Sequence, residues 1–384
     1  MKLGVDVLFE SRKSLLLHHR VGLVTNYSMT NSSLVPVIDC FREDTEFELV
    51  KLFGPEHGVK NSAKEGEHVD FEVDPHSGIR AYSLYGETRR PSAEMMEGID
   101  VLVVDLQDIG ARYYTNASTL FLCMESCSEA HVPCIVLDRP NPIGGSRREG
   151  FVRKPEFSSF VGMLPVVNRH GCTMGELAQL IKKRFVQDVE LTVVSLEGWH
   201  RQMLYSDTGL PWVSPSPNTT GLSMMLLYPG TCLVEGTNLS IGRGTTHPFE
   251  YVGAPWLDGH RLAAWFNQTG VSGVVARPAY FTPFYSQYQG QLCQGVQLHV
   301  THASKVHGLH AGITLIRGIK EMWPREFKFL DAPPQGGRPF FDLLAGDDAL
   351  RSAISSGTAD TYLDKEDAGL RRFSVEVSEF QLYE

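Results

Sequence analysis

Five apolar runs in the first half of the chain predict buried β-strands, at 21–26, 48–53, 100–105, 133–138 and 191–195. Continuous apolar runs are typical of strands that are covered on both faces, as in a parallel sheet. Helices are predicted at 33–41, 119–130 and 174–185, and Thr173 followed by Glu176 predicts a capping box at the start of the last one. This alternation predicts an α/β fold with an open, mostly parallel sheet.

The pattern changes after residue 205. Pro, Gly, Ser, Asn and Thr dominate the segment 205–255, yet aromatic residues such as Trp212, Tyr228 and Phe249 recur in it. Disordered segments are poor in aromatic residues, so we expect ordered irregular structure that forms one wall of a site. Beyond this segment the pattern predicts helices at 260–266, 308–322 and 340–355 and strands at 274–276 and 295–300. We therefore expect two domains, at 1–250 and 251–384, of which the second is a smaller α+β domain.

The composition argues against several classes of protein. The 384 residues are 42% apolar and 21% charged, and the net charge of −10 comes without a Lys- or Arg-rich block, so nucleic acid is not an expected partner. No run approaches the ~20 apolar residues of a membrane span, and the first residues lack the apolar core of a signal peptide. The seven cysteines include no CxxC pair, which indicates neither a zinc site nor a disulfide framework. We expect a cytoplasmic protein with reduced thiols; the alternative is an exported protein whose signal peptide has been removed from this sequence.

The strand at 48–53 runs directly into the turn Gly54-Pro55-Glu56-His57-Gly58. Gly and Pro end the strand and shape a sharp turn, which the strand then holds in place. A Glu and a His side by side on such a turn are well placed for proton transfer. A loop ion pair, or a Glu that caps the next segment, explains the same pattern. The polar stretch that follows, 61–75, predicts a long loop of the kind that forms lids or binding segments.

Polar residues follow four of the predicted strands. They are Thr25 and Asn26 after the first, Glu56 and His57 after the second, Asp105, Gln107, Asp108, Arg112 and Tyr113 after the third, and Asp138, Arg139 and Asn141 after the fourth. Ligands of open α/β sheets bind beyond the carboxyl ends of the strands, so this coincidence favours a catalytic Glu56. Structural explanations stay open, because Asp105 and Asp138 could cap helices and Arg112 could pair with Asp108.

A glycine-rich loop, Gly242-Arg243-Gly244-Thr245-Thr246, follows Glu235 and Asn238 and could hold an anion with its amides. It lacks the lysine of a P-loop, and the turn at 25–28 lacks GxGxxG, so no dinucleotide is indicated. A metal site from His57, Asp105, Asp108 and His68 is conceivable, but no HxH or HExxH spacing supports it. We expect no metal and no cofactor.

With these residues assembled, the chain resembles the DUF1343 family, now known as the NamZ-type exo-β-N-acetylmuramidases. The matching segments are FGPEHG at 53–58, DLQDIGARYYT at 105–115, DRPNPIGG at 138–145, RHGCTMGELA at 169–178, SPSPN at 214–218 and YPGTCLVEGTNLSIGRGTTHPFE at 228–250. They are spread over about the first 250 residues, and the remainder matches more loosely.

The resemblance implies a Rossmann-like N-terminal domain, a smaller C-terminal domain and an active site in the cleft between them. It implies release of terminal β-linked N-acetylmuramic acid from the non-reducing end of peptidoglycan fragments, without a cofactor. The family's proposed catalytic glutamate corresponds to Glu56. Asn116, Ile241 and the pair Thr219-Thr220 depart from the family pattern, which bears on sugar or aglycone preference.

This reading gives a mechanistic hypothesis. Glu56 is the general acid, partly desolvated by its turn, and His57 orients or tunes it. For the second group, either the N-acetyl group of the sugar attacks while Asp105 or Asp108 orients it, or a second carboxylate acts as nucleophile or base. We expect Arg243, and next Arg112, to bind the lactyl carboxylate of the sugar, because a guanidinium can bind a carboxylate bidentately.

The other expected substrate-binding residues are Asn26, Gln107, Asp108, Tyr113, Arg139, Asn141, Asn218, Glu235, Asn238 and Thr245. Two alternative functions stay open. A non-catalytic muropeptide-binding protein predicts saturable binding without turnover. A metal-dependent hydrolase predicts loss of activity with EDTA.

Overall fold

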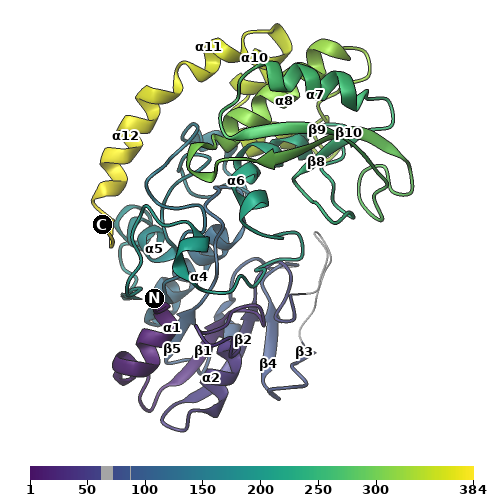
Figure 1. The fold of residues 1–384 in the computed structure, drawn as a ribbon. Coiled ribbons are helices and arrows are strands. Elements are labelled where there is room, and N and C mark those ends of the chain that lie inside the picture. Colours follow the sequence, from purple (N-terminus) through teal and green to yellow (C-terminus); the bar gives the residue numbers. More distant parts are fainter. Residues whose placement is uncertain (62–71, 87) are drawn as a thin grey trace.

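The computed structural model describes residues 1–61, 72–86 and 88–384. Its lower half in Figure 1 holds a large sheet and its upper half a small one. Most of the long loop predicted at 61–75 lies outside the described residues.

The large sheet confirms the predicted open α/β fold. Its order is β3-β4-β2-β1-β5-β6-β7, and all pairs are parallel except β3 with β4. The strands are β1 (Arg20–Val24), β2 (Glu48–Gly54), β3 (Glu72–Val73), β4 (Arg80–Ser83), β5 (Val101–Val104), β6 (Cys134–Leu137) and β7 (Leu191–Val194). The chain reverses its direction of winding between β1 and β5, and ligands of such sheets bind beyond the strand ends at this kind of point.

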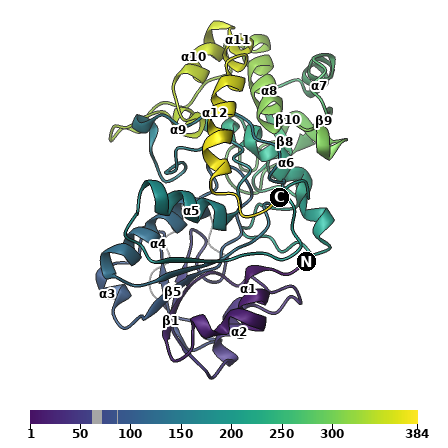
Figure 2. The ribbon, with the colours of Figure 1, turned by 90° about the vertical axis from the view of Figure 1, so that its left-hand side faces the viewer.

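Helices cover both faces of this sheet, as the continuous apolar strands predict. Val101 and Val103 of β5 join one core and Leu102 and Val104 join another, because successive side chains of a strand point to opposite faces. One face is covered by α1 (Gly4–Val7) and α2 (Val37–Glu43), and the other by α3 (Ala93–Met96), α4 (Asn116–Ala130) and α5 (Met174–Arg184) (Figure 2). The predicted capping box of α5 is confirmed: the Thr173 side chain accepts from the Glu176 amide, and the Glu176 carboxylate accepts from the Thr173 amide.

The small sheet is antiparallel, with the order β8-β10-β9. Its strands are β8 (Tyr251–Ala254), β9 (Val274–Phe281) and β10 (Cys293–Val300). It packs with α7 (Gly259–Gln268) and α8 (Gly308–Met322) in one apolar core. Helix α8 spans the residues predicted for it.

The segment 205–255 is ordered, but it is more regular than predicted. It contains α6 (Leu222–Thr231), the 3₁₀-helix η5 (Cys232–Gly236) and the whole of β8. Residues 224–231 of α6 are all buried, so the helix has no polar face and shows no amphipathic period. It also contains Pro229, which normally argues against a helix.

The predicted helix at 340–355 is two helices, α9 (Phe340–Ala345) and α10 (Ala349–Ser356). Gly346, which caps α9 with φ +85°, breaks the helix between them. After α11 (Ala359–Leu363), α12 (Glu366–Ser378) returns to the large sheet, where Phe373 and Val377 enter its core (Figure 1). Helix α6 precedes residue 250 yet packs with the small sheet, whereas Phe373 and Val377 follow residue 250 yet pack with the large sheet. Packing therefore crosses the predicted domain boundary in both directions.

Within the described residues, no helix is both long and apolar enough to cross a membrane.

The crossing of α6 and α8 depends on glycines. A Cβ on Gly312 would overlap the backbone of Gly230, and a Cβ on Gly230 would lie 2.8 Å from the Gly312 amide nitrogen. The two helices therefore meet backbone to backbone.

We predict that Gly312→Ala lowers the free energy of unfolding by about 1–3 kcal/mol, because the added methyl overpacks this crossing. The control is Gly369→Ala in α12, where a Cβ meets nothing within 4 Å. This control should be neutral or stabilising by about 0.5–1 kcal/mol, as alanine usually is within a helix. Urea unfolding followed by circular dichroism measures both, and equal effects would refute the close crossing.

Candidate active site

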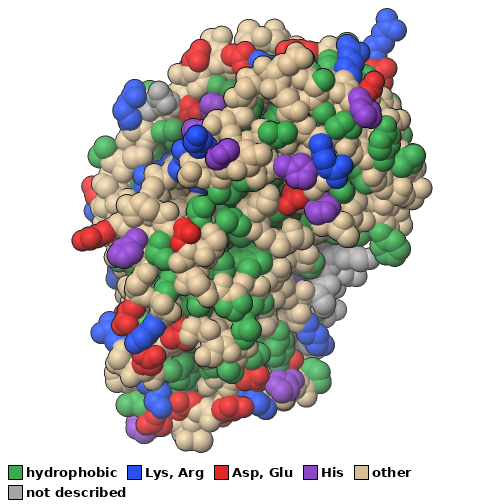
Figure 3. Space-filling model, in the orientation of Figure 1, with side chains coloured by type: hydrophobic (Ala, Val, Ile, Leu, Met, Phe, Trp, Pro, Cys, Tyr) green, Lys and Arg blue, Asp and Glu red, His purple; other side chains and the backbone are tan. Residues whose placement is uncertain are grey.

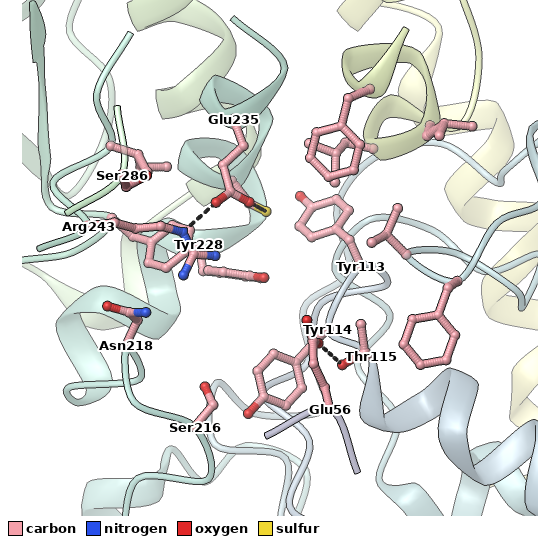
Figure 4. Close-up of a pocket in the computed structure, with 18 of the residues that line it drawn as sticks. Glu56, Tyr113, Tyr114, Thr115, Ser216, Asn218, Tyr228, Glu235, Arg243 and Ser286 are labelled. Carbon is pink, nitrogen blue, oxygen red and sulfur yellow. Dashed lines mark hydrogen bonds and ion pairs between the residues drawn. The ribbon is translucent and has the colours of Figure 1, made fainter. Parts of the chain in front are cut away.

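A cavity of about 690 Å³ lies between the parts of the chain that carry the two sheets. Its lower wall comes from the turn after β2 and the loop after β5, and its upper wall from α6, η5 and the loop before β8 (Figure 4). The hairpin between β9 and β10 and helix α9 complete the lining. Its volume is typical of sites for small ligands. In the space-filling view, hydrophobic side chains gather across the middle of the face shown, and charged ones at its lower end (Figure 3).

Glu56 projects into this cavity from the turn after β2. The strand is held from both sides, because Thr25 donates its amide hydrogen to the Phe53 carbonyl at 3.0 Å and Leu84 donates to the Gly54 carbonyl at 2.8 Å. The hydroxyl of Thr115 donates to Oε2 of Glu56 at 2.6 Å. The position of the carboxylate therefore depends on two strands, since Glu56 follows β2 and Thr115 follows β5. His57, the next residue of the turn, also lines the cavity.

Three consecutive residues after β5, Tyr113, Tyr114 and Thr115, line the cavity. The hydroxyl of Tyr113 donates to the Pro229 carbonyl of α6, which ties this loop to the upper wall. Burial raises the pKa of Tyr113 and of Tyr114 well above the ordinary value for tyrosine. Both phenols are therefore neutral hydrogen-bonding groups near neutral pH.

The upper wall holds an ion pair. Nε of Arg243 donates to Oε1 of Glu235 at 2.6 Å, and Sγ of Cys232 lies 3.5 Å from Oε2. The guanidinium also stacks on the ring of Phe249, 4.9 Å from its centroid. Figure 4 shows this pair across the cavity from Glu56. The glycine-rich loop thus places Arg243 in the cavity wall, where Glu235 balances its charge.

The loop at 214–218 and the β9–β10 hairpin meet at the side of the cavity. The hydroxyl of Tyr285 donates to Oδ1 of Asn218 at 3.1 Å. The amide of Phe284 donates to the Gly244 carbonyl at 2.8 Å, and a Cβ on Gly244 would lie 2.6 Å from the Tyr285 amide nitrogen. The hairpin is thereby joined to two other walls.

The structure brings six of the residues predicted for the site into the cavity lining: Glu56, His57, Tyr113, Asn218, Glu235 and Arg243. The other predicted residues are placed outside it, in the frame that carries its loops.

Asp105 and Arg139 form a buried ion pair with each other. Nη2 of Arg139 donates to Oδ2 of Asp105 at 2.9 Å, Nε donates to Oδ1, and Nη2 also reaches the Thr30 carbonyl at 2.9 Å. Both side chains are almost fully buried, and neither lines the cavity. The pair joins the ends of β5 and β6, which explains why a carboxylate and an arginine stand there in the sequence.

Gln107, Asp108 and Asn141 also serve the frame. Gln107 donates to the carbonyls of Asp108 and Pro140 at 2.7 and 2.9 Å, and Asn141 donates to the Cys172 carbonyl at 2.9 Å. Asp108 accepts from the Gly110 amide at 2.6 Å and lies 3.2 Å from the buried His170 ring, rather than pairing with Arg112. These contacts fix the loops after β5 and β6 below the cavity.

Arg112 is buried, and both of its terminal nitrogens are engaged. It donates to the carbonyls of Phe151, Val166, Leu344 and Ala345. Burial lowers its pKa to about 10, so the side chain is still cationic near neutral pH. Leu344 and Ala345 end α9, where a cation satisfies the last carbonyls of a helix. Arg112 thus fastens α9 to the large domain and is not available to a substrate.

Asn26, Asn238 and Thr245 support wall loops from behind. Asn26 donates to the Pro215 carbonyl at 3.5 Å, beside the loop that carries Asn218. Asn238 exchanges hydrogen bonds with the Glu326 carbonyl and the Lys328 amide, both at 2.8 Å. Thr245 donates to the Gly242 carbonyl at 2.6 Å.

Several lining residues were not predicted. Tyr114, Thr115 and Ser216 lie inside the matching segments DLQDIGARYYT and SPSPN, so those segments could have indicated them. Tyr85, Arg89 and Phe160 come from loops without any motif, and nothing in the sequence pattern marks them.

The described residues contain no group of three or more His, Cys, Asp or Glu side chains that could hold a metal ion. Of the four residues considered for such a site, His68 lies outside the described part of the chain, and Asp105 and Asp108 have the partners given above.

Sequence comparison identifies the chain over nearly all its length. The model of the N-terminal region of exo-β-N-acetylmuramidase NamZ matches residues 21–223, and that of its C-terminal region matches 226–383. The peptidoglycan β-N-acetylmuramidase NamZ of Bacillus subtilis is 42% identical over 381 residues, which cover 99% of this chain and 91% of that protein.

Two solved structures from Bacteroides fragilis share the fold, and both are DUF1343 family proteins. One has a TM-score of 0.89 and 34% identity, and the other a TM-score of 0.77 and 28% identity. Each comparison covers 100% of this chain and 99% of the other. The matched regions, the identity and the shared fold together show that this chain belongs to the NamZ family of exo-β-N-acetylmuramidases.

Proposed function

We propose that this protein is a glycosidase that releases terminal β-linked N-acetylmuramic acid from the non-reducing end of peptidoglycan fragments. The observation that carries the proposal is the position of Glu56, which a hydrogen bond from Thr115 holds in a cavity lined by both parts of the chain. Membership of the family and the 42% identity to a peptidoglycan β-N-acetylmuramidase give the class of substrate. A role in the cytoplasm stays a prediction from the sequence.

Glu56 is the proton donor in this proposal. Glycoside hydrolysis needs an acid on the leaving oxygen and a group that compensates the positive charge developing at the anomeric carbon. The hydrogen bond from Thr115 holds one carboxyl oxygen. The other has no hydrogen-bond partner among the described residues and is left for the glycosidic oxygen.

Glu235 is our candidate for the compensating charge. Asp105 and Asp108, the carboxylates first considered for the second position, lie in the frame below the cavity. Among the described residues, Glu56 and Glu235 are the carboxylates that line it, and they face each other from opposite walls (Figure 4). Hydrogen bonds from Arg243 and Cys232 keep Glu235 oriented. An oriented, ionised carboxylate stabilises an oxocarbenium-like transition state without reorganising.

We predict that Glu56→Gln lowers kcat for a muramic acid–glucosamine disaccharide by about 10²- to 10⁴-fold, since a positioned general acid contributes that much. Chromatography of the released N-acetylmuramic acid measures kcat, and a parallel assay contains EDTA. Unfolding of the variant should match the wild type. Full activity of the variant would contradict the assignment, and EDTA-sensitive wild-type activity would favour a metal-dependent hydrolase.

Asp105→Asn should act on stability instead. Removing one partner of a buried ion pair leaves Arg139 uncompensated, which costs about 3–5 kcal/mol. We expect a lower urea midpoint, and a kcat within a few-fold of wild type for the protein that remains folded. A large loss of kcat at unchanged stability would place Asp105 in the chemistry after all.

A further inference from the structure

The charges of the described side chains around the cavity do not cancel. Besides His57, the acidic and basic side chains among the described lining residues are Glu56, Arg89, Glu235 and Arg243. Glu235 and Arg243 balance each other at 2.6 Å. A general acid enters the reaction protonated, so Glu56 adds no charge in the reactive form of the proposed enzyme. Among these described side chains, Arg89 then carries a positive charge that no carboxylate compensates.

Arg89 is held by rings rather than by acids. Its guanidinium carbon lies 4.5 Å from the centroid of Phe160 and 5.6 Å from that of Tyr85, and the two rings are 5.8 Å apart. Within the described part of the chain, it makes no hydrogen bond and no ion pair. Stacking uses the face of a guanidinium and leaves the N–H groups on its edge available.

We propose that Arg89 binds a carboxylate of the substrate and thereby selects muramic acid over uncharged amino sugars. This inference rests on the proposed function and deepens it. A stacked guanidinium is already oriented, so little side-chain entropy is lost when it binds a planar carboxylate through two parallel N–H···O bonds.

The other two arginines considered for this carboxylate are less suitable. Arg112 does not line the cavity, and its two terminal nitrogens donate to four backbone carbonyls. Arg243 lines the cavity but is paired with Glu235, whose negative charge repels a second carboxylate at the same place. Arg89 has no carboxylate partner among the described residues, so it pays no such penalty.

A peptidoglycan fragment carries carboxylates from two sources. One is the lactyl group of a muramic acid without a peptide, and the other is the stem peptide, whose attachment converts the lactyl carboxylate to an amide. Three disaccharides, in all of which both amino groups are acetylated, separate them: N-acetylmuramic acid–N-acetylglucosamine with a free lactyl group, the same disaccharide with a stem peptide, and N-acetylglucosamine–N-acetylglucosamine.

The test compares Arg89→Gln with wild type on these substrates. We expect kcat/KM for the free lactyl substrate to fall by about 10- to 100-fold, mainly through KM, as for the loss of a charged hydrogen bond. The glucosamine disaccharide should change by less than about 3-fold, because it has no carboxylate to lose. Dependence on Arg89 that appears only with the peptide-bearing substrate would assign the carboxylate to the peptide.

Arg90→Gln is the matched control. Arg90 is the next residue, pairs with Glu129 at 2.8 Å on the surface and does not line the cavity, so its replacement should leave all three values unchanged. Arg89→Lys keeps the charge without the fork and should recover part of the loss.

Two outcomes would overturn the inference. One is an equal loss on charged and uncharged substrates. The other is a preference for muramic acid that survives in Arg89→Gln and disappears in Arg243→Gln. If wild type cleaves none of the substrates, the proposed function fails, and calorimetry then decides on Arg89. The inference holds if wild type binds N-acetylmuramic acid more tightly than N-acetylglucosamine and Arg89→Gln abolishes the difference, and it fails otherwise.

Discussion

The position of Glu56 depends on the close packing of Gly54 against the turn that follows it. A Cβ on Gly54 would overlap the Val59 amide and would lie 2.6 Å from the carbonyl carbon of Gly58. Gly58 itself has φ +70°, a backbone conformation that residues with a Cβ rarely adopt. A strand held on both sides thus ends in a turn that folds back tightly and points its acid into the cavity.

Several hydrogen bonds join the two parts of the chain that line the cavity. Arg112 binds the last carbonyls of α9, and Tyr113 binds the end of α6, both from the loop after β5. On the far side, α12 brings Tyr383 back to the large domain, where its hydroxyl donates to Asp138 at 2.5 Å. One short loop therefore supplies a cavity wall and the ties that hold the opposite wall in place.

The sequence predicted the large sheet well, because strands buried on both faces leave continuous apolar runs, as in Val101–Val104. It missed α6, which is buried all round and contains Pro229, so that neither period nor propensity marks it. The polar strand ends indicated where the cavity lies, but not which residues line it. Asp105 and Arg139 were predicted to belong to the site, but in the structure they form a buried ion pair with each other and do not line the cavity. Arg89 and Phe160 meet across about 70 residues of chain and could be found only in the structure.

The most direct test of the central claim, that Glu56 donates the proton to the leaving group, is the dependence of rate on leaving-group acidity. Muraminides of a series of phenols, together with the natural disaccharide, are compared in wild type and Glu56→Ala. A proton donor predicts that the variant loses about 10²- to 10⁴-fold on the sugar leaving group and progressively less as the phenol becomes more acidic, because a good leaving group needs no proton. The same loss for every leaving group would contradict that assignment.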